Sequence, residues 1–135
     1  MRQVRVMIVD DAPEVREALG TLLPLAGAAA GLAVEVVGEA GDGLGAVERV
    51  AALAPDVVLM DLEMPEMDGF TATRAVKAVC PLTRVVVLSV HSDPVSRDLS
   101  RDAGADAFVE KGLGITDLLE SIAGSPPEEA EGGTT

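Results

Sequence analysis

Five short apolar runs alternate along the chain with segments in which apolar residues recur every three or four positions. Runs without polar alternation are typical of strands covered on both faces, whereas the wider spacing is typical of helices with one buried face. This alternation predicts a doubly wound α/β fold with a parallel sheet, right-handed crossovers and helices on both faces. The expected strands span residues 4–9, 34–40, 57–60, 84–89 and 107–110.

The segments between these runs begin and end with residues that favour helix termini. The expected starts are Pro13, Asp42, Phe70 after Gly69, and Pro94 after Ser92 and Asp93, and the expected ends are Pro24, Pro55 and Pro81. The expected buried faces are Val15, Ala18, Leu19 and Leu22; Val47, Val50, Ala51 and Ala54; Phe70, Thr73, Val76 and Val79; Val95, Leu99 and Ala103; and Ile115, Leu118, Leu119 and Ile122. The fourth helix has few apolar anchors, so we expect it to be the least firmly packed. Residues 25–33 are compatible with either a longer first helix or a loop.

The composition favours one thin-layered domain. At 135 residues the chain fits a single domain with a substantial core. Trp and Tyr are absent and Phe occurs only twice, so small aliphatic residues must supply the packing. The last residues have the Pro, Gly and acid content of a linker or tail. We therefore expect a folded domain over residues 1–123 and a flexible acidic segment over residues 124–135.

Charge and cysteine usage exclude several classes of function. The formal net charge of -13 argues against nucleic acid as a direct ligand, because phosphate binding needs clustered Lys and Arg. Cys80 is the only cysteine, which excludes an internal disulfide and a cysteine metal cluster. The apolar run near the N-terminus is short and ends in acids, unlike a signal peptide or a membrane span. These features predict a cytoplasmic protein without membrane contact.

The most informative stretch is VVLMDLEMPEMDG, residues 57–69, where a buried strand ends on Asp61. Pro65 and Gly69 prevent the chain from continuing as a strand and shape a loop around the acid. In open α/β sheets, ligands bind beyond the carboxyl ends of the strands, so Asp61 is a candidate for chemistry. Asp is also common in ordinary loops after strands, and Asp61 alone leaves both interpretations open.

Other strand ends bring polar residues to the same edge. Asp10 and Asp11 follow the first strand, Ser89 ends the fourth and Lys111 follows the fifth. Three crowded carboxylates repel one another unless a divalent cation and a lysine offset their charge. Oxygen ligands suit Mg²⁺, which takes one or two carboxylates together with phosphate oxygens and water.

These five positions resemble the active site of the receiver domain of two-component response regulators, with the likeness covering roughly residues 3–123. The resemblance implies a flavodoxin-like or CheY-like sheet of order 2-1-3-4-5. It also implies that Asp61 accepts a phosphoryl group from the phosphohistidine of a sensor histidine kinase. Asp11, Asp61 and the backbone carbonyl of Glu63 would bind Mg²⁺ or Mn²⁺ directly, and Asp10 would act through water.

Further roles follow from the same resemblance. Ser89 and Lys111 would hold phosphoryl oxygens, and Ser89 would act as a switch together with Phe108. Without the family context, Phe108 has an equally good interpretation as ordinary core. The positions expected to tune hydrolysis are Glu63, Val90 and His91.

The chain departs from the family pattern at two positions and leaves the output open. Gly112 follows Lys111 where proline is usual, and Val90 is bulkier than the residue common there. The stretches VVGEA, DLEMPEMDG and LSVHSD resemble the branch with a LuxR-type helix-turn-helix output, which implies transcription regulation. That output domain is missing, so we expect either a receiver cut within its linker or a single-domain regulator, with DNA reached only through an output domain. The implied homodimer faces are the fourth helix, fifth strand and fifth helix, or the first and fifth helices.

Four other interpretations compete with this one. Gly41, Gly43 and Ala46 match a loose dinucleotide fingerprint, but they leave Asp10 and Asp11 unexplained and also fit a glycine-rich turn before a helix. A haloacid-dehalogenase-type phosphatase would need a second Asp two positions after its nucleophile. A flavodoxin-like cofactor binder would need a phosphate loop and aromatic platforms for its flavin. A degenerate receiver that is never phosphorylated is disfavoured because all the required residues are present.

Overall fold

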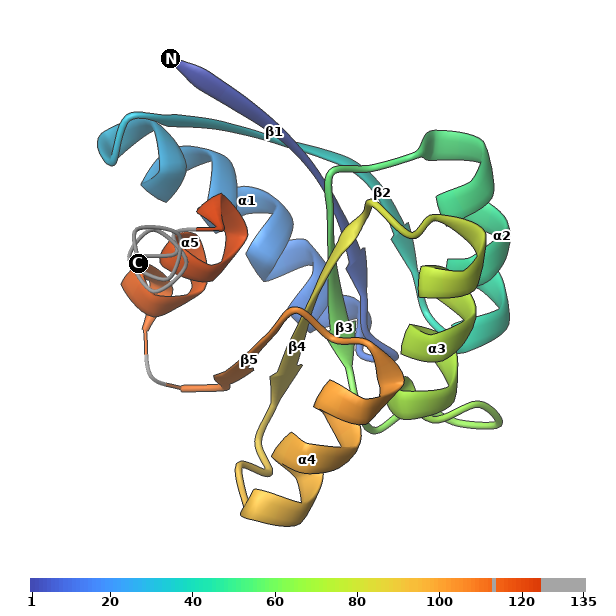
Figure 1. Cartoon of the computed structure of the whole chain (residues 1–135). Coiled ribbons are helices and arrows are strands. Elements are labelled where there is room, and N and C mark those ends of the chain that lie inside the picture. The colour runs from blue at the N-terminus through green and yellow to red at the C-terminus, as the bar shows by residue number, and fades with distance from the viewer. Residues whose placement is uncertain (113, 125–135) are drawn as a thin grey trace, which may run out of the picture.

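The structure, a computed structural model, describes residues 1–112 and 114–124. Five parallel strands form one sheet of order β2-β1-β3-β4-β5, which is the predicted architecture (Figure 1). The strands are β1 (Arg2–Val9), β2 (Leu32–Ala40), β3 (Val57–Asp61), β4 (Arg84–Ser89) and β5 (Ala107–Glu110). The helices are α1 (Pro13–Ala29), α2 (Gly43–Leu53), α3 (Gly69–Val79), α4 (Pro94–Ala103) and α5 (Ile115–Ala123). No helix in the described ranges is long and apolar enough to cross a membrane.

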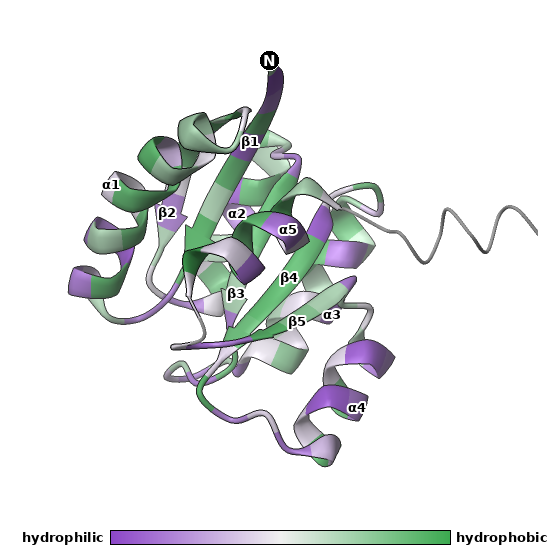
Figure 2. Ribbon diagram, turned by 90° about the vertical axis from the view of Figure 1, so that its left-hand side faces the viewer, coloured by the Kyte–Doolittle hydropathy of each residue, from purple (hydrophilic) through white to green (hydrophobic). Residues whose placement is uncertain are grey.

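Helices α1 and α5 lie on one face of the sheet and α2 and α3 on the other (Figure 1), and the sheet separates two hydrophobic cores. One lies between the sheet and α1 with α5, and is built around Ile8, Leu59 and Ile122. The other lies between the sheet and α2 with α3, and is built around Met7, Met60 and Val76. Successive residues at positions 6–9 of β1 and 57–60 of β3 enter opposite cores, which explains why these parts of the central strands are apolar without interruption (Figure 2).

Helix α1 corrects the expectation that Pro24 ends or unravels the first helix. The helix continues through Pro24 to Ala29, so most of the small-residue segment prolongs it. Leu23 and Gly27, on either side of the proline, are buried against the sheet, and this packing outweighs the hydrogen bond that proline cannot donate. A Cβ on Gly27 would lie 2.7 Å from the Leu32 carbonyl oxygen, so glycine allows α1 to approach β2 closely.

Several predicted buried faces are also wrong by about one position, because apolar spacing alone does not fix the rotation of a helix against the sheet. The misplaced residues are Ala18, Leu22, Ala51, Ala54, Val79, Val95 and Leu99, all of which are exposed. Helix α4 differs most: Val95 is 65% and Leu99 45% exposed, and Ser100 is buried beside the predicted Ala103. The Ser100 hydroxyl is satisfied by donating to the Ser96 carbonyl at 2.8 Å. Only the last helix buries its predicted face as a whole, with Ile115 half-buried.

The boundary of the folded domain remains an expectation. Helix α5 ends at Ala123, and Gly124 caps it with a positive φ of 68°. The acidic tail expected from this point lies outside the described residues, apart from Gly124.

Thr73 on α3 is expected to cost stability. Its side chain is fully buried and its hydroxyl has no hydrogen-bond partner within the described parts of the chain. Removing an unsatisfied buried polar group is favourable, so Thr73→Val should raise the free energy of unfolding by about 1 kcal/mol. The matched control is Thr83→Val, because the buried Thr83 hydroxyl donates to the Pro55 carbonyl at 2.8 Å. Urea denaturation should show a gain for the first variant and a loss for the second; equal losses would contradict the assignment.

Candidate functional site

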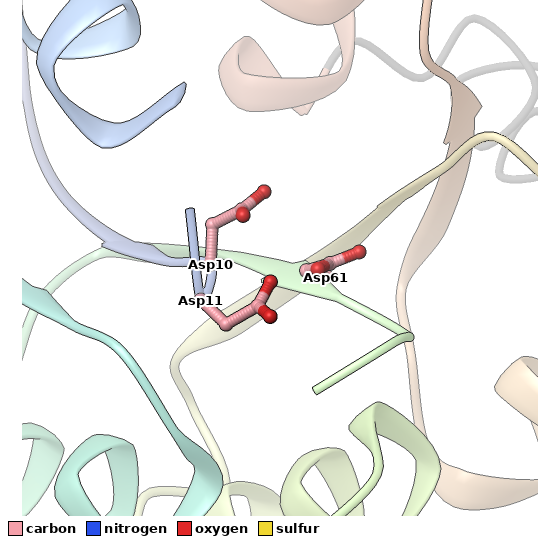
Figure 3. Close-up of side chains that lie close together, drawn as sticks. All are labelled: Asp10, Asp11 and Asp61. Carbon is pink, nitrogen blue, oxygen red and sulfur yellow. The ribbon is translucent and has the colours of Figure 1, made fainter. Parts of the chain in front are cut away.

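The carboxyl edge of the sheet gathers the polar residues that the sequence placed at strand ends. Asp10 directly follows β1, Asp61 is the last residue of β3, Ser89 is the last residue of β4 and Lys111 directly follows β5. Figure 3 shows the side chains of Asp10, Asp11 and Asp61 lying close together at this edge. Parallel pairing of β3 with both β1 and β4 brings these chain positions together.

Three carboxylates form the acidic centre of the site. Asp10, Asp11 and Asp61 each offer an oxygen, and these oxygens lie within 4.8 Å of one another. Asp10 is 3% and Asp61 6% exposed, whereas Asp11 is exposed. The cluster therefore has two buried acids and one acid that solvent reaches, and its all-oxygen donor set is the kind that Mg²⁺ prefers.

Lys111 supplies the positive charge that the sequence placed beside these acids. Its Nζ lies 3.1 Å from Asp10 Oδ2 and 3.5 Å from Asp61 Oδ1. Its backbone N–H donates to the Ser89 carbonyl at 2.8 Å, which fixes the end of β5 against β4. The lysine thus binds both buried carboxylates at once.

Ionisation of Asp61 is unfavourable despite the nearby Lys111. Burial raises the pKa of the Asp61 carboxyl and the charge of Asp10 raises it further, while Lys111 and the Glu63 N–H lower it less. Burial alone would lower the pKa of Lys111, but its hydrogen bond to Asp10 and the charges of Asp61 and Asp10 raise it overall. A raised carboxyl pKa in the folded state means that ionised Asp61 destabilises the fold, and a bound cation would relieve this.

Arg16 is a site residue that sequence reasoning missed. Its Nη1 donates to the Asp10 backbone carbonyl at 2.6 Å, and its Nε pairs with Glu39 Oε1 at 3.0 Å. The Asp10 side chain is held in turn by the Ala12 N–H, which donates to Oδ1 at 2.9 Å. The sequence offered one signal for this role: Arg16 is a basic residue in the first turns of the helix that follows Asp10 and Asp11.

Gly69 positions the strand end that carries Asp61. Its N–H donates to the Leu62 carbonyl at 2.9 Å, and a Cβ here would lie 2.3 Å from the Asp61 carbonyl oxygen. The glycine is needed for this close approach of backbones, and its φ is not positive. The expected helix start at Phe70 therefore moves one residue, to Gly69.

Gly69→Ala should destabilise the protein, because the added methyl group meets backbone that cannot move without displacing Asp61. We expect a loss of about 2 kcal/mol or more in the free energy of unfolding. Gly20→Ala is the control: a Cβ at Gly20, inside α1, meets no atom within 4 Å. That variant should gain about 0.5–1 kcal/mol, because alanine favours the helix. Thermal and urea denaturation measure both, and similar effects of the two changes would refute the close-approach argument.

The loops after β3 and β4 meet over the site. Ser89 is 1% exposed, and its Oγ accepts a hydrogen bond from the His91 N–H at 3.0 Å. The His91 imidazole contacts the Glu63 carboxylate, which joins the two loops. Val90 points outward and is 58% exposed. The sequence singled out all three of these outer residues but did not predict that His91 and Glu63 touch.

Phe108 belongs to neither hydrophobic core. It is half-buried on β5, and the guanidinium carbon of Arg97 lies 4.6 Å from the centre of its ring. This placement does not fit its interpretation as ordinary core.

The glycine-rich turn before α2 has a structural explanation. The Asp42 carboxylate caps the helix by accepting from the Gly45 N–H at 2.7 Å. A Cβ on Gly43 would lie 2.6 Å from Met67 Sδ, so this glycine allows close packing. The N-terminus of α2 is therefore capped by a carboxylate of the chain itself. A pyrophosphate site would instead leave these N–H groups for the ligand, so the turn is structural.

Comparison with known proteins agrees with this geometry. The family model for the response regulator receiver domain matches residues 6–123. A probable transcriptional regulatory protein NarL from Mycobacterium tuberculosis is 38% identical over 120 residues, which cover 89% of this chain and 53% of that protein. A protein-glutamate methylesterase/protein-glutamine glutaminase from Anaeromyxobacter dehalogenans is 42% identical over 88% of this chain and 32% of its own length.

Solved structures agree as well. The receiver domain of the M. tuberculosis NarL superposes with a TM-score of 0.78 at 36% identity, covering 92% of this chain and 99% of that chain. The response regulator domain of Thermotoga maritima CheB gives a TM-score of 0.81 at 32% identity, covering 92% and 96%. This chain spans about half of the NarL relative and a third of the methylesterase, so the likeness concerns their receiver domains. By sequence and by fold, the chain belongs to the response regulator receiver domains of two-component signalling systems.

Proposed function

We propose that this receiver domain takes a phosphoryl group from the phosphohistidine of a sensor histidine kinase onto Asp61, and thereby alters an interaction surface. The observation that supports this most is the Asp61 carboxylate itself, 6% exposed at the carboxyl end of β3 and 3.5 Å from the Lys111 ammonium. A buried carboxylate with a raised pKa, next to further acids and a lysine, suits phosphoryl transfer better than a structural role. The domain would catalyse only its own phosphorylation and dephosphorylation.

The donor set fits a divalent cation. Asp11 and Asp61 would bind Mg²⁺ or Mn²⁺ directly together with the backbone carbonyl of Glu63, and Asp10 would act through water. Lys111 already binds Asp10 in the structure, which leaves the exposed Asp11 as the more available direct ligand. The cation, when bound, would neutralise oxygens of the transferred group.

The chain's own residues would perform the remaining work. An oxygen of Asp61 attacks phosphorus in line, a P–O bond forms, the P–N bond of the phosphohistidine breaks, and its electron pair returns to the imidazole nitrogen. Lys111 would donate a hydrogen bond to one phosphoryl oxygen, and the Ser89 hydroxyl would donate to another once the group is attached. Glu63 and His91, which contact each other after the ends of β3 and β4, and the exposed Val90 would tune the approach of hydrolytic water.

The test is phosphoryl uptake from a small donor such as acetyl phosphate. The intact mass should rise by one phosphoryl group when Mg²⁺ is present and remain unchanged when a chelator removes the cation. A mass that never rises under conditions that preserve the fold would contradict the proposal.

The output would reside on the face formed by α4, β5 and α5. Helix α4 buries only Ser100 and Ala103 and leaves Val95 and Leu99 exposed, so its position costs little to change. Self-association through this face, or through α1 and α5, would then respond to phosphorylation. Transcription regulation, as the name of the NarL relative implies for that protein, would require DNA contact through an output domain beyond residue 123 and its linker.

Hydrogen exchange should locate this output. With beryllium fluoride and Mg²⁺ as a phosphoryl mimic, we expect changed protection in residues 89–112 and 114–122, where Ser89, α4 and Phe108 lie. Residues 47–54 of α2 serve as an internal control and should not change. Changes confined to α2 would contradict the proposed output face.

A further inference from the structure

Arg97 connects the loop after β4 with the aromatic side chain on β5. Its Nε donates to the Ser92 carbonyl at 3.1 Å, and its guanidinium carbon lies 4.6 Å from the centre of the Phe108 ring. A guanidinium at this distance from an aromatic face is attracted by the electrons of the ring. One side chain on the first turns of α4 therefore holds both the loop and the ring.

The loop that Arg97 binds is the one that Ser89 anchors at the site. The Ser89 hydroxyl oxygen accepts from the His91 N–H at 3.0 Å, and Ser92 follows directly. A chain of contacts thus runs from the buried hydroxyl through residues 91 and 92 to Arg97 and the ring. If Ser89 turns towards a group on Asp61, its contact with the His91 N–H weakens and the loop is free to shift.

The Arg97 guanidinium contacts the Phe108 ring and no carboxylate among the described residues. Among the described residues Arg97 makes no ion pair, although the chain carries 23 acids. Arg101, one turn further along α4, instead pairs with Asp98 at 3.1 Å and is largely exposed. Both arginines line the same hollow beside Phe108, but only Arg97 stacks on the ring.

We propose that Arg97 is a positioning residue that latches Phe108 and the loop after β4 in the resting arrangement. The latch opposes the change that phosphorylation promotes, so it sets how much of the protein adopts the active arrangement. The inference rests on the proposed phosphoryl switch for its effect on signalling, but the latch itself is a property of the unmodified protein. Losing it should shift the conformational equilibrium towards the active arrangement.

The test compares Arg97→Gln with Arg101→Gln, because glutamine preserves helix propensity in both. Ring-labelled phenylalanine gives two sets of NMR signals, from Phe108 and from Phe70 on α3, which serves as the reference. In Arg97→Gln without any ligand, the Phe108 signals should move towards the positions they take in the unsubstituted protein with beryllium fluoride and Mg²⁺. Calorimetry should show that this variant binds beryllium fluoride in Mg²⁺ about fivefold more tightly, as expected for the loss of one exposed cation–π contact.

Arg101→Gln should leave both measurements unchanged. A double-mutant cycle with Phe108→Leu provides a readout that a merely structural role would not move: the gain in affinity from Arg97→Gln should shrink when the ring is absent, to the part that comes from the hydrogen bond to the Ser92 carbonyl. Identical Phe108 signals and affinities in the two arginine variants would overturn the proposal. If beryllium fluoride fails to bind the unsubstituted protein, the phosphoryl function fails, and the ligand-free spectra still decide whether the latch exists: Arg97→Gln should move the Phe108 signals away from those of the unsubstituted protein, whereas Arg101→Gln should not.

Discussion

Asp61→Asn is expected to abolish phosphoryl uptake completely. The amide oxygen is a far weaker nucleophile than a carboxylate. Among the described acids, Asp10 is the other buried one at a strand end that contacts Lys111. Both of its oxygens are already engaged, one by the Lys111 Nζ and one by the Ala12 N–H, so we do not expect it to replace Asp61. The variant should remain folded, because it removes an ionised group whose pKa is raised by burial and by Asp10. Its melting temperature in the absence of Mg²⁺ should therefore equal or exceed that of the unsubstituted protein.

Asp68→Asn is the matched control for this experiment. Asp68 lies in the same loop and caps α3 by accepting from the Thr71 N–H at 2.8 Å, a role that asparagine performs equally well. This variant should take up the phosphoryl group normally. Intact-mass measurement after incubation with acetyl phosphate and Mg²⁺ checks both variants, and uptake by Asp61→Asn would show that the phosphoacceptor is another residue.

Asp11→Ala is expected to remove most of the stabilisation that Mg²⁺ gives to the fold. A cation that binds only the folded state stabilises it by about 2.7 kcal/mol at a concentration one hundred times its dissociation constant. Asp11 is exposed at the rim of the acidic cluster, so its removal takes away a ligand and leaves the Asp10–Lys111 pair intact. The melting temperature without Mg²⁺ should change little.

Two comparisons sharpen this prediction. Asp10→Asn should retain more of the Mg²⁺-dependent shift in melting temperature than Asp11→Ala, because Asp10 would act only through water. Asp98→Ala, on the exposed face of α4, should retain all of it. A full Mg²⁺-dependent shift in Asp11→Ala would contradict the metal assignment.

The sheet and the place of the site could be predicted from sequence because both depend on chain order. A central strand buried on both faces is apolar along its buried length, as residues 57–60 are before Asp61, and this leaves a clear signal. Parallel pairing then brings the residues after each strand to one edge, whatever the details of packing. Asp10, Asp61 and Lys111 therefore meet where the sequence placed them.

The helix faces and the side-chain contacts could not be predicted in the same way. The continuation of α1 through Pro24 depends on the tertiary packing of Leu23 and Gly27, which a local proline rule does not include. Two side-chain contacts were also not predicted: Arg97 stacks on Phe108, and Arg16 donates to the Asp10 carbonyl. Each depends on how side chains from different elements are oriented towards one another. Such contacts leave no periodic pattern in the chain.

The measurement that tests the central claim most directly is the location of the phosphoryl group. Acyl phosphates are reduced by borohydride to the alcohol, so an aspartyl phosphate becomes homoserine and keeps a permanent mark. After incubation with acetyl phosphate and Mg²⁺, reduction and proteolysis, the peptide that contains residues 57–69 should carry homoserine at position 61 and all other aspartates should be intact. Homoserine at another aspartate, or none in a preparation whose intact mass had risen by one phosphoryl group, would contradict the account.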